Sequence, residues 1–155
     1  MSTSTDLYTL LDRLVIVHNH IDQLVMEPLA LNTVRYWILY SINKEPGLSF
    51  TRLSELNLLD RASASRMIRS MEKKGLIKRQ LDENDRRYYS LFLTEAGQSL
   101  YEAAHKAFIA DIETRFEDIA QDDRSSIQDS LEHTLDMLCA HRDLLLEDRI
   151  RATDR

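Results

Sequence analysis

Apolar residues recur every three or four positions from Asp6 to about Met26, which is the spacing of one face of an α-helix. The stripe would run over about six helical turns. Pro28 should end it, because proline disfavours helical geometry in the residue before it. A helix this long must bury its stripe against another element. The members of the stripe are Leu7, Leu10, Leu11, Leu14, Val17, Ile21, Leu24 and Val25.

Two further long helices are predicted at the other end of the chain, the first capped by Thr94. Only three glycines and two prolines interrupt the 155 residues, which favours long helices over a loop-rich β fold. Apolar stripes at both ends of the chain need partners, so we expect a homodimer; the alternative is that these helices fold back on the middle. The stripes are Leu100, Ala104, Ala107, Phe108 and Ile112, then Ile127, Leu131, Leu135, Leu138 and Leu145.

The middle of the chain predicts shorter elements. Asn32 or Thr33 can cap a helix through "VRYWILYSI" that ends at the "EPG" of residues 45–47. Because this helix is apolar almost all round, we expect it to be central and buried. Ser49 or Thr51 can cap a third helix, "FTRLSEL".

A basic helix and a hairpin follow. Asp60 is a good cap for "RASASRMIRSMEKK", with Ala64, Met67, Ile68 and Met71 on its inner face and Gly75 ending it. The stretches "LIKRQL" and "RYYSLFL" alternate as two strands around a polar turn, with Tyr89, Leu91 and Leu93 facing the core. The expected fold is therefore mainly α with a small β-hairpin, in the order of a winged helix-turn-helix between terminal helices.

The charge of the chain is unevenly distributed. The net charge is −6, but residues 60–89 hold nine lysines and arginines against five acids, which gives this span +4 and the remainder −10. A basic island in an acidic body suits a protein with one face that meets phosphate. The alternative is a chance cluster of charges on solvated helix faces.

Residues 53–97 resemble the multiple-antibiotic-resistance regulator (MarR) family. Several spaced motifs match together: Leu53, Leu59–Asp60–Arg61, Glu72–Lys73–Lys74–Gly75–Leu76, Arg79, Asp85 with Arg87, and Leu93–Thr94–Glu95 with Gly97. The resemblance implies a homodimeric DNA-binding repressor with a winged helix-turn-helix at 33–94 and a helical dimerisation region at 1–32 and 95–155. Two departures are visible. Asn57–Leu58 replaces the usual leucine–glycine of the turn, where asparagine tolerates left-handed geometry, and Ala62 and Ala64 replace a hydroxyl and a valine.

The basic helix is the predicted DNA-reading element. A helix-turn-helix inserts its second helix into the major groove with its N-terminal residues toward the base edges. Arg61, Ser63, Ser65 and Arg66 are the candidates for base contacts, with phosphate contacts an equal alternative for the two arginines. Arg69 and Lys73, a turn or more further on, are candidates for phosphate contacts.

The hairpin is the predicted wing. A narrow minor groove over A/T-rich DNA attracts an inserted arginine, and the resemblance assigns this role to Arg87, with Asp85 as the acid that orients it. Arg86 is the competing candidate for the minor-groove arginine or, alternatively, a phosphate contact. The alternative is that Asp85 and Arg87 only pair with each other, which would stabilise the turn by at most about 1 kcal/mol. A dimer would place two such units roughly 34 Å apart on a pseudo-palindrome.

Members of the family usually answer a small molecule, often an aromatic carboxylate, and release DNA. The resemblance places the ligand pocket between the first, second and fifth helices and the DNA-binding lobe, where the candidates are Arg13, His18, Tyr36, Trp37, Tyr40 and His105. Arg13 is a possible carboxylate clamp and, alternatively, an ordinary solvated or ion-pairing residue. For His18 the simpler expectation is a core histidine satisfied by a carbonyl, and for Trp37 and the tyrosines a place in the core.

Other classes of function find less support in the sequence. The five histidines and single cysteine offer no converging metal ligands, and we expect neither a metal nor a cofactor. Peroxide sensing would need an exposed thiol of low pKa, whereas Cys139 flanks an apolar stripe. No acid–base or nucleophile constellation marks an enzyme. A winged helix that binds only protein remains the main alternative, with a redox- or metal-responsive family member behind it. No signal peptide or membrane-spanning run is visible, so we expect a cytoplasmic protein.

Overall fold

A computed structural model describes residues 3–81 and 89–153 of the chain. The described chain is mainly helical with one small antiparallel sheet, as the sequence predicts. It divides into two compact units, residues 1–112 and 113–155, which are described separately below. The predicted functional division into residues 33–94 and the two flanking regions stays a prediction. Among the described residues, none of the helices combines the length and the apolar content that a membrane crossing requires.

Helix α1 (Ser4–Met26) begins at a reciprocal cap. The backbone N–H of Asp6 donates to Thr3 Oγ1 at 3.2 Å, and the N–H of Thr3 donates to Asp6 Oδ2 at 2.8 Å. The helix ends at Met26, and Pro28 lies in the short 3-10 helix η1 (Glu27–Leu29) that follows, as predicted. Met26 is fully buried, but most of the apolar stripe before it is exposed in the single chain.

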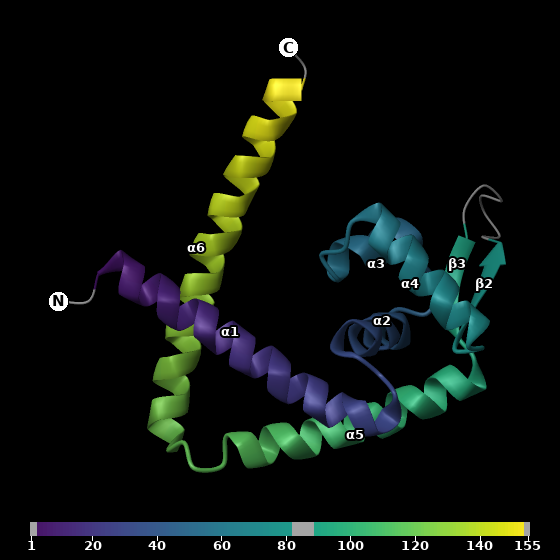
Figure 1. The fold of residues 1–155 in the computed structure, drawn as a ribbon, viewed down its shortest axis with the longest axis horizontal. Helices are drawn as coiled ribbons and strands as arrows, with labels where there is room; N and C mark the ends of the chain where they lie inside the picture. The colour runs from purple at the N-terminus through teal and green to yellow at the C-terminus, as the bar shows by residue number, and fades with distance from the viewer. Residues whose placement is uncertain (1–2, 82–88, 154–155) are drawn as a thin grey trace. The chain divides into compact units, whose positions relative to one another are not determined.

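Helix α2 (Thr33–Lys44) is the centre of the first unit, in contact with α1, α3 and strand β3 (Figure 1). Asn32 is its cap and accepts a hydrogen bond of 2.9 Å from the N–H of Arg35. One side of α2 is buried, including Tyr36 and Ile38. The expected central position is confirmed, but the expected burial holds for one side only, because Val34 and Trp37 are 37% and 40% exposed.

Three strands form the sheet: β1 (Leu48–Ser49), β2 (Ile77–Leu81) and β3 (Tyr89–Leu93), in the order β1-β3-β2. The predicted hairpin is confirmed, and β1 adds an antiparallel partner on its other edge, with Leu48 opposite Leu91. The sequence did not predict β1, because two residues are too few to show an alternating pattern.

Helices α3 (Phe50–Leu56) and α4 (Arg61–Lys73) form the helix-turn-helix. Ser49 caps α3 and Asp60 caps α4, and Gly75 follows α4 with a left-handed φ of 68°. Both helices contribute to one core with α1, α2, the sheet and α5. Its buried members are Met26, Leu31, Tyr36, Ile38, Leu39, Ile42, Leu48, Leu53, Ile68, Met71, Ile77, Leu91, Tyr101, Ala104 and Phe108.

Helix α5 (Glu95–Arg115) starts directly against the turn that ends α4. Thr94 caps it, because its Oγ1 accepts a bond of 3.0 Å from the N–H of Gly97 and donates to the carbonyl of Gly75. A Cβ added at Gly97 would lie 2.0 Å from the carbonyl oxygen of Leu76. The first turn of α5 is therefore joined tightly to the end of the basic helix.

The second unit consists mainly of α6 (Gln121–Thr153). Arg124 fixes its start by donating to the carbonyls of Ile119 at 2.8 Å and Phe116 at 2.6 Å, which satisfies carbonyls at the preceding turn. The apolar residues predicted along this helix are exposed in the single chain; Leu131 is 46% and Leu135 60% exposed.

Candidate nucleic-acid interface

The start of α4 is fixed by its cap. Asp60 Oδ1 accepts a hydrogen bond of 2.9 Å from the N–H of Ser63. Hydrogen bonds from the side chain and backbone of Ser63 lower the pKa of Asp60 below its ordinary value, so this carboxylate is ionised at neutral pH. Its negative charge lies at the positive end of the helix dipole, which stabilises both.

The two faces of α4 differ sharply in burial. Ala64, Ile68 and Met71 are fully buried, at the spacing that places them on one side of the helix. The predicted basic contacts lie on the other sides and are exposed, namely Arg61, Arg66, Arg69 and Lys73. Ser63 and Ser65 are half-buried along the flanks. All six predicted contacts of the reading helix are thus on one element whose inner face is anchored in the core.

One contact orders the basic face locally. Arg66 Nη2 donates a hydrogen bond of 3.1 Å to Ser63 Oγ, one turn earlier on the same helix. Both side chains were predicted to reach base edges. The bond presents them together, as a guanidinium beside a hydroxyl, near the N-terminal end of α4.

The predicted wing contacts Asp85, Arg86 and Arg87 lie outside the described residues, so their roles stay predictions. The strand that follows them is described. Leu91 is buried and Leu93 half-buried, as predicted, but Tyr89 is 51% exposed. The expectation that Tyr89 anchors the strand is wrong, because this end of the sheet extends past the core.

The turn between α3 and α4 has no glycine, and we expected Asn57 to take the left-handed conformation in its place. Asn57 has a φ of −100°, and the left-handed residue is Leu58, with a φ of 50°. Asn57 instead donates side-chain hydrogen bonds of 3.1 Å to Ser41 Oγ and 3.0 Å to the carbonyl of Leu53. The side chain of Leu58 is 78% exposed.

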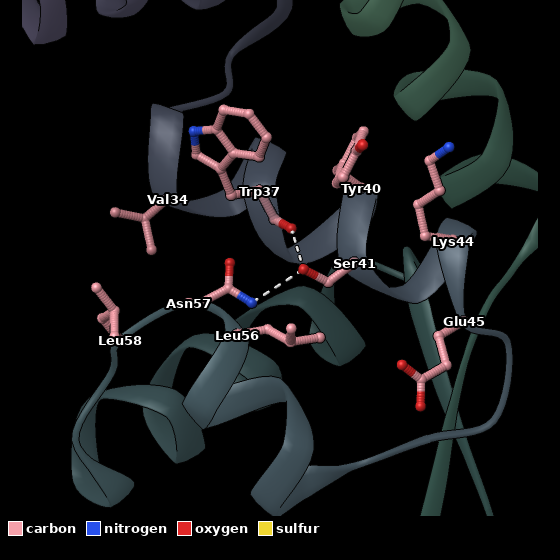
Figure 2. A pocket seen from close by; sticks show the side chains of 9 residues that line it. All are labelled: Val34, Trp37, Tyr40, Ser41, Lys44, Glu45, Leu56, Asn57 and Leu58. Carbon is pink, nitrogen blue, oxygen red and sulfur yellow. Dashed lines mark hydrogen bonds between the residues drawn. The ribbon is translucent and has the colours of Figure 1, made fainter. Parts of the chain in front are cut away.

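A pocket of about 590 Å³ opens between α2 and this turn. Figure 2 shows Trp37 and Val34 on one side, the Asn57 amide bonded to Ser41 at the base, and Lys44 and Glu45 at the far end. Of the six predicted ligand residues, Trp37 and Tyr40 line it. Lys44 was missed, although its position seven residues after Trp37 places both on one side of α2.

Tyr36 and His105 meet beside this pocket rather than in its lining. Tyr36 Oη lies 2.9 Å from His105 Nδ1, within an aromatic cluster that includes Tyr101 and Phe108. Burial raises the pKa of Tyr36 to about 12, with a smaller contribution from Tyr101, so the phenol stays neutral at physiological pH. The expectation of a core position for Tyr36 is confirmed.

Arg13 and His18 lie on α1 and do not line this pocket. Arg13 is exposed. His18 is 50% exposed, with its Nε2 3.4 Å from the carboxylate of buried Asp22, so the expectation of a core position for His18 is wrong. Cys139 is half-buried on α6. The described residues contain no group of three or more His, Cys, Asp or Glu side chains arranged to hold a metal ion.

A capped basic helix, preceded by a short helix and a tight turn and flanked by a three-stranded sheet, defines a winged helix-turn-helix. Residues 31–89 match the model of the MarR family. Over these residues the winged helix-turn-helix of this chain is similar to that family.

Similar proteins agree with this assignment. The HTH-type transcriptional regulator YybA of Bacillus subtilis (strain 168) is 32% identical over 81 residues, which cover 52% of this chain and 54% of YybA. The match thus spans about half of that relative. A MarR protein from Peptoclostridium difficile is 22% identical, with 89% of this chain and 92% of that chain covered and a TM-score of 0.76. The transcriptional repressor CouR, bound to a 23-mer DNA duplex, is 22% identical, with coverages of 81% and 88% and a TM-score of 0.72. The two structures show that the fold is shared.

Proposed function

We propose that this chain is a sequence-specific DNA-binding transcriptional regulator, a homodimeric repressor that a small molecule releases from its operator. The basic outer face of α4 carries the proposal. Its inner face is fully buried at Ile68 and Met71, so the helix is fixed while Arg61, Arg66 and Arg69 remain exposed. A rigid helix with an exposed basic face and a free N-terminal end suits the major groove of B-DNA.

The MarR-family match supports DNA as the partner. CouR, which shares the fold, is a repressor bound to a DNA duplex. Occupation of a promoter by such a protein would repress by excluding the polymerase. The acidic remainder of the chain, at −10, would keep the rest of its surface away from phosphate.

A gel shift on the DNA upstream of the protein's own gene, repeated over a range of salt concentrations, tests this function. We expect salt-dependent binding and competition by unlabelled specific DNA but much weaker competition by random duplex. Arg87→Ala should weaken binding and reduce the dependence of log K on log salt, with Lys44→Gln as a matched loss of charge away from α4. A chain that binds no DNA at any salt concentration would instead be a protein-interaction winged helix.

The exposed apolar surface supports the homodimer. On α1, Leu10 is 64% and Val17 55% exposed, and on α6 Leu135 is 60% and Leu145 54% exposed. Stripes of this length exceed the scattered apolar residues of a monomer surface and mark association sites. A second copy of the chain presents the same stripes, so a two-fold symmetric dimer would bury the stripes of both copies. The dimer would carry two α4 helices to successive turns of a pseudo-palindrome.

The pocket between α2 and the turn supports a small-molecule effector. Its volume of about 590 Å³ lies in the range of ligand sites. Trp37 supplies an aromatic wall, Leu56 and Leu58 supply apolar contacts, and Lys44 supplies a cation for a carboxylate. Because Leu58 is two residues before the cap of α4, an occupant would bear directly on the turn that positions the reading helix.

A panel of aromatic acids added to the gel shift tests the effector. We expect one of them to release the DNA, and Trp37→Ala to lose this response while DNA binding itself persists. Comparison of Lys44→Gln with Arg13→Ala identifies the cation that holds the carboxylate. Release that survives both charge changes would contradict an anionic ligand, and indifference to the whole panel would contradict the aromatic-acid class.

A further inference from the structure

A second groove, of about 380 Å³, lies at the sheet side of α4. Its lining consists of Ser49, Phe50, Thr51, Ser65, Arg79, Tyr89 and Leu91. Four of these seven side chains bear a hydroxyl and one bears a positive charge. The groove therefore combines hydrogen-bond donors with apolar surface.

The pairing of strands β2 and β3 shows which face of the sheet forms one wall of the groove. Arg79 lies opposite Leu91, and Leu81 lies opposite Tyr89. Residues opposite each other share a face of the sheet, and so do residues two apart on one strand. Leu91 is 2% exposed, so this is the face that covers the core. Leu81 and Tyr89 continue the same face but are 53% and 51% exposed. The inner face of the sheet thus projects beyond the core.

The helix side of the groove is fixed by one ion pair. Arg79 Nη2 lies 2.7 Å from Glu72 Oε2, which joins β2 to the second half of α4. Ser65 is seven residues before Glu72, so it lies on the same side of α4. That side faces the sheet. The groove therefore runs between the N-terminal half of α4, which carries the predicted base contacts, and the projecting part of the sheet.

We propose that this groove seats the sugar–phosphate backbone of one DNA strand. The inference rests on the proposed DNA binding. A helix that lies in the major groove has a sugar–phosphate backbone along each side. This groove lies on the sheet side of α4, where one of these backbones would pass.

The chemistry of the lining suits both parts of a nucleotide backbone. Serine, threonine and tyrosine hydroxyls and arginine are common partners of phosphate oxygens. The rings of Phe50 and Tyr89, which line the groove, offer apolar surface to deoxyribose. Arg79 has five N–H donors, and its ion pair with Glu72 is made through Nη2. Glu72 would hold the guanidinium in place for the phosphate.

The first test compares the loss of one positive charge at two neighbouring positions of strand β2. Lys78 precedes Arg79 on β2 and lies on the opposite face of the sheet. We expect Arg79→Met to weaken binding by about tenfold or more, equally for upstream and random duplex, and to reduce the salt slope by about 0.9 for each phosphate lost per site. Lys78→Met should leave affinity and slope near wild type. If the two variants have the same affinity and the same salt slope, the groove does not seat the DNA backbone.

The second test avoids the ion pair, whose loss could disturb the fold. Thr51→Val replaces a groove hydroxyl with a methyl group of similar size and should weaken binding to both duplexes by about threefold to tenfold. Methylphosphonates placed singly along each strand supply the DNA half of a double-mutant cycle. We expect one position per half-site where the effect of the neutral linkage and the effect of Thr51→Val are not additive. If the two effects are additive at every position, the groove does not seat the backbone, although the protein still binds DNA. If the wild-type protein binds no duplex at all, the proposed function itself is wrong.

Discussion

The side-chain amide of Asn57 donates a hydrogen bond of 3.1 Å to the hydroxyl of Ser41, which joins the turn before the reading helix to the central helix α2. Ser41 in turn donates to the carbonyl of Trp37 at 2.8 Å, in the wall of the proposed effector pocket. A path of hydrogen bonds thus leads from that pocket to the turn (Figure 2). It gives an occupant a physical means of acting on α4.

Loss of this bond should weaken the turn. We expect Asn57→Ala to lower the free energy of unfolding by about 1–3 kcal/mol, because the two side-chain hydrogen bonds of Asn57 are lost. Urea unfolding measures the change. Ser41→Ala removes the same bond together with the bond from Ser41 to Trp37, so it too should lower the free energy of unfolding. An Asn57→Ala variant with the urea midpoint of wild type would contradict the assignment.

The neighbouring residue should respond in the opposite direction. Leu58 holds a φ of 50°, which costs a residue with a side chain about 1–2 kcal/mol, and its side chain is 78% exposed. Leu58→Gly should therefore raise the free energy of unfolding, by up to about 1 kcal/mol after the greater freedom of glycine in the unfolded chain is included. The urea midpoint of this variant should exceed that of wild type. A lower midpoint would mean that the Leu58 side chain contributes packing that its exposure does not suggest.

Gly97 should be among the least replaceable residues of the chain. A Cβ at this position would lie 2.0 Å from the backbone oxygen of Leu76, so backbone must move. We expect Gly97→Ala to destabilise by about 3 kcal/mol or more, the range of overpacking and lost backbone bonds combined. Gly75→Ala is the matched control, because its Cβ would meet nothing within 4 Å and only the left-handed φ of 68° costs energy. Thermal unfolding of the two variants should rank Gly97→Ala as the more damaging.

Alkaline pH should weaken the fold through Tyr36. Its pKa rises from an ordinary 10.0 to about 12 in the folded chain. The stabilisation from keeping this phenol neutral is complete below about pH 10 and is lost as pH rises toward 12, since the unfolded chain ionises first. Tyr36→Phe should lower stability by about 1 kcal/mol at neutral pH through the lost bond to His105 and should flatten the alkaline decline. Some decline should remain, because burial also raises the pKa of Tyr101. If Tyr36→Phe loses as much stability at alkaline pH as wild type, the loss comes from groups other than Tyr36.

Association should depend on the exposed stripe of α6. Leu135→Asp places a charge where we propose that a second copy packs, and we expect it to shift the mass in sedimentation equilibrium toward the monomer. Thr134→Asp is the control on the adjacent face. If both variants retain the mass of wild type, the Leu135 stripe does not form the contact. If wild type itself is monomeric, the homodimer is wrong.

Much of the fold could be predicted because its signals are local. Pro28, Asn32, Ser49, Asp60 and Thr94 each mark an element boundary through the geometry or side-chain bonds of a few neighbouring residues, and each boundary is confirmed. The buried face of α4 follows from helical spacing alone. The same reasoning predicted the basic outer face, which now remains to be tested on DNA.

Other features depended on partners distant in sequence. Strand β1 exists because Leu48 pairs with Leu91, and Tyr89 is exposed because the sheet extends past the core there. Asn57 could be recognised as a turn residue, but its bond to Ser41 is set by the packing of α3 on α2, which moves the left-handed conformation to Leu58. Spacing along the chain is enough to predict which helices form and which side of α4 is basic. The contact of Arg79 with Glu72 beside Ser65 could not be predicted in this way, because a groove is made by surfaces from separate elements that meet only in the folded chain.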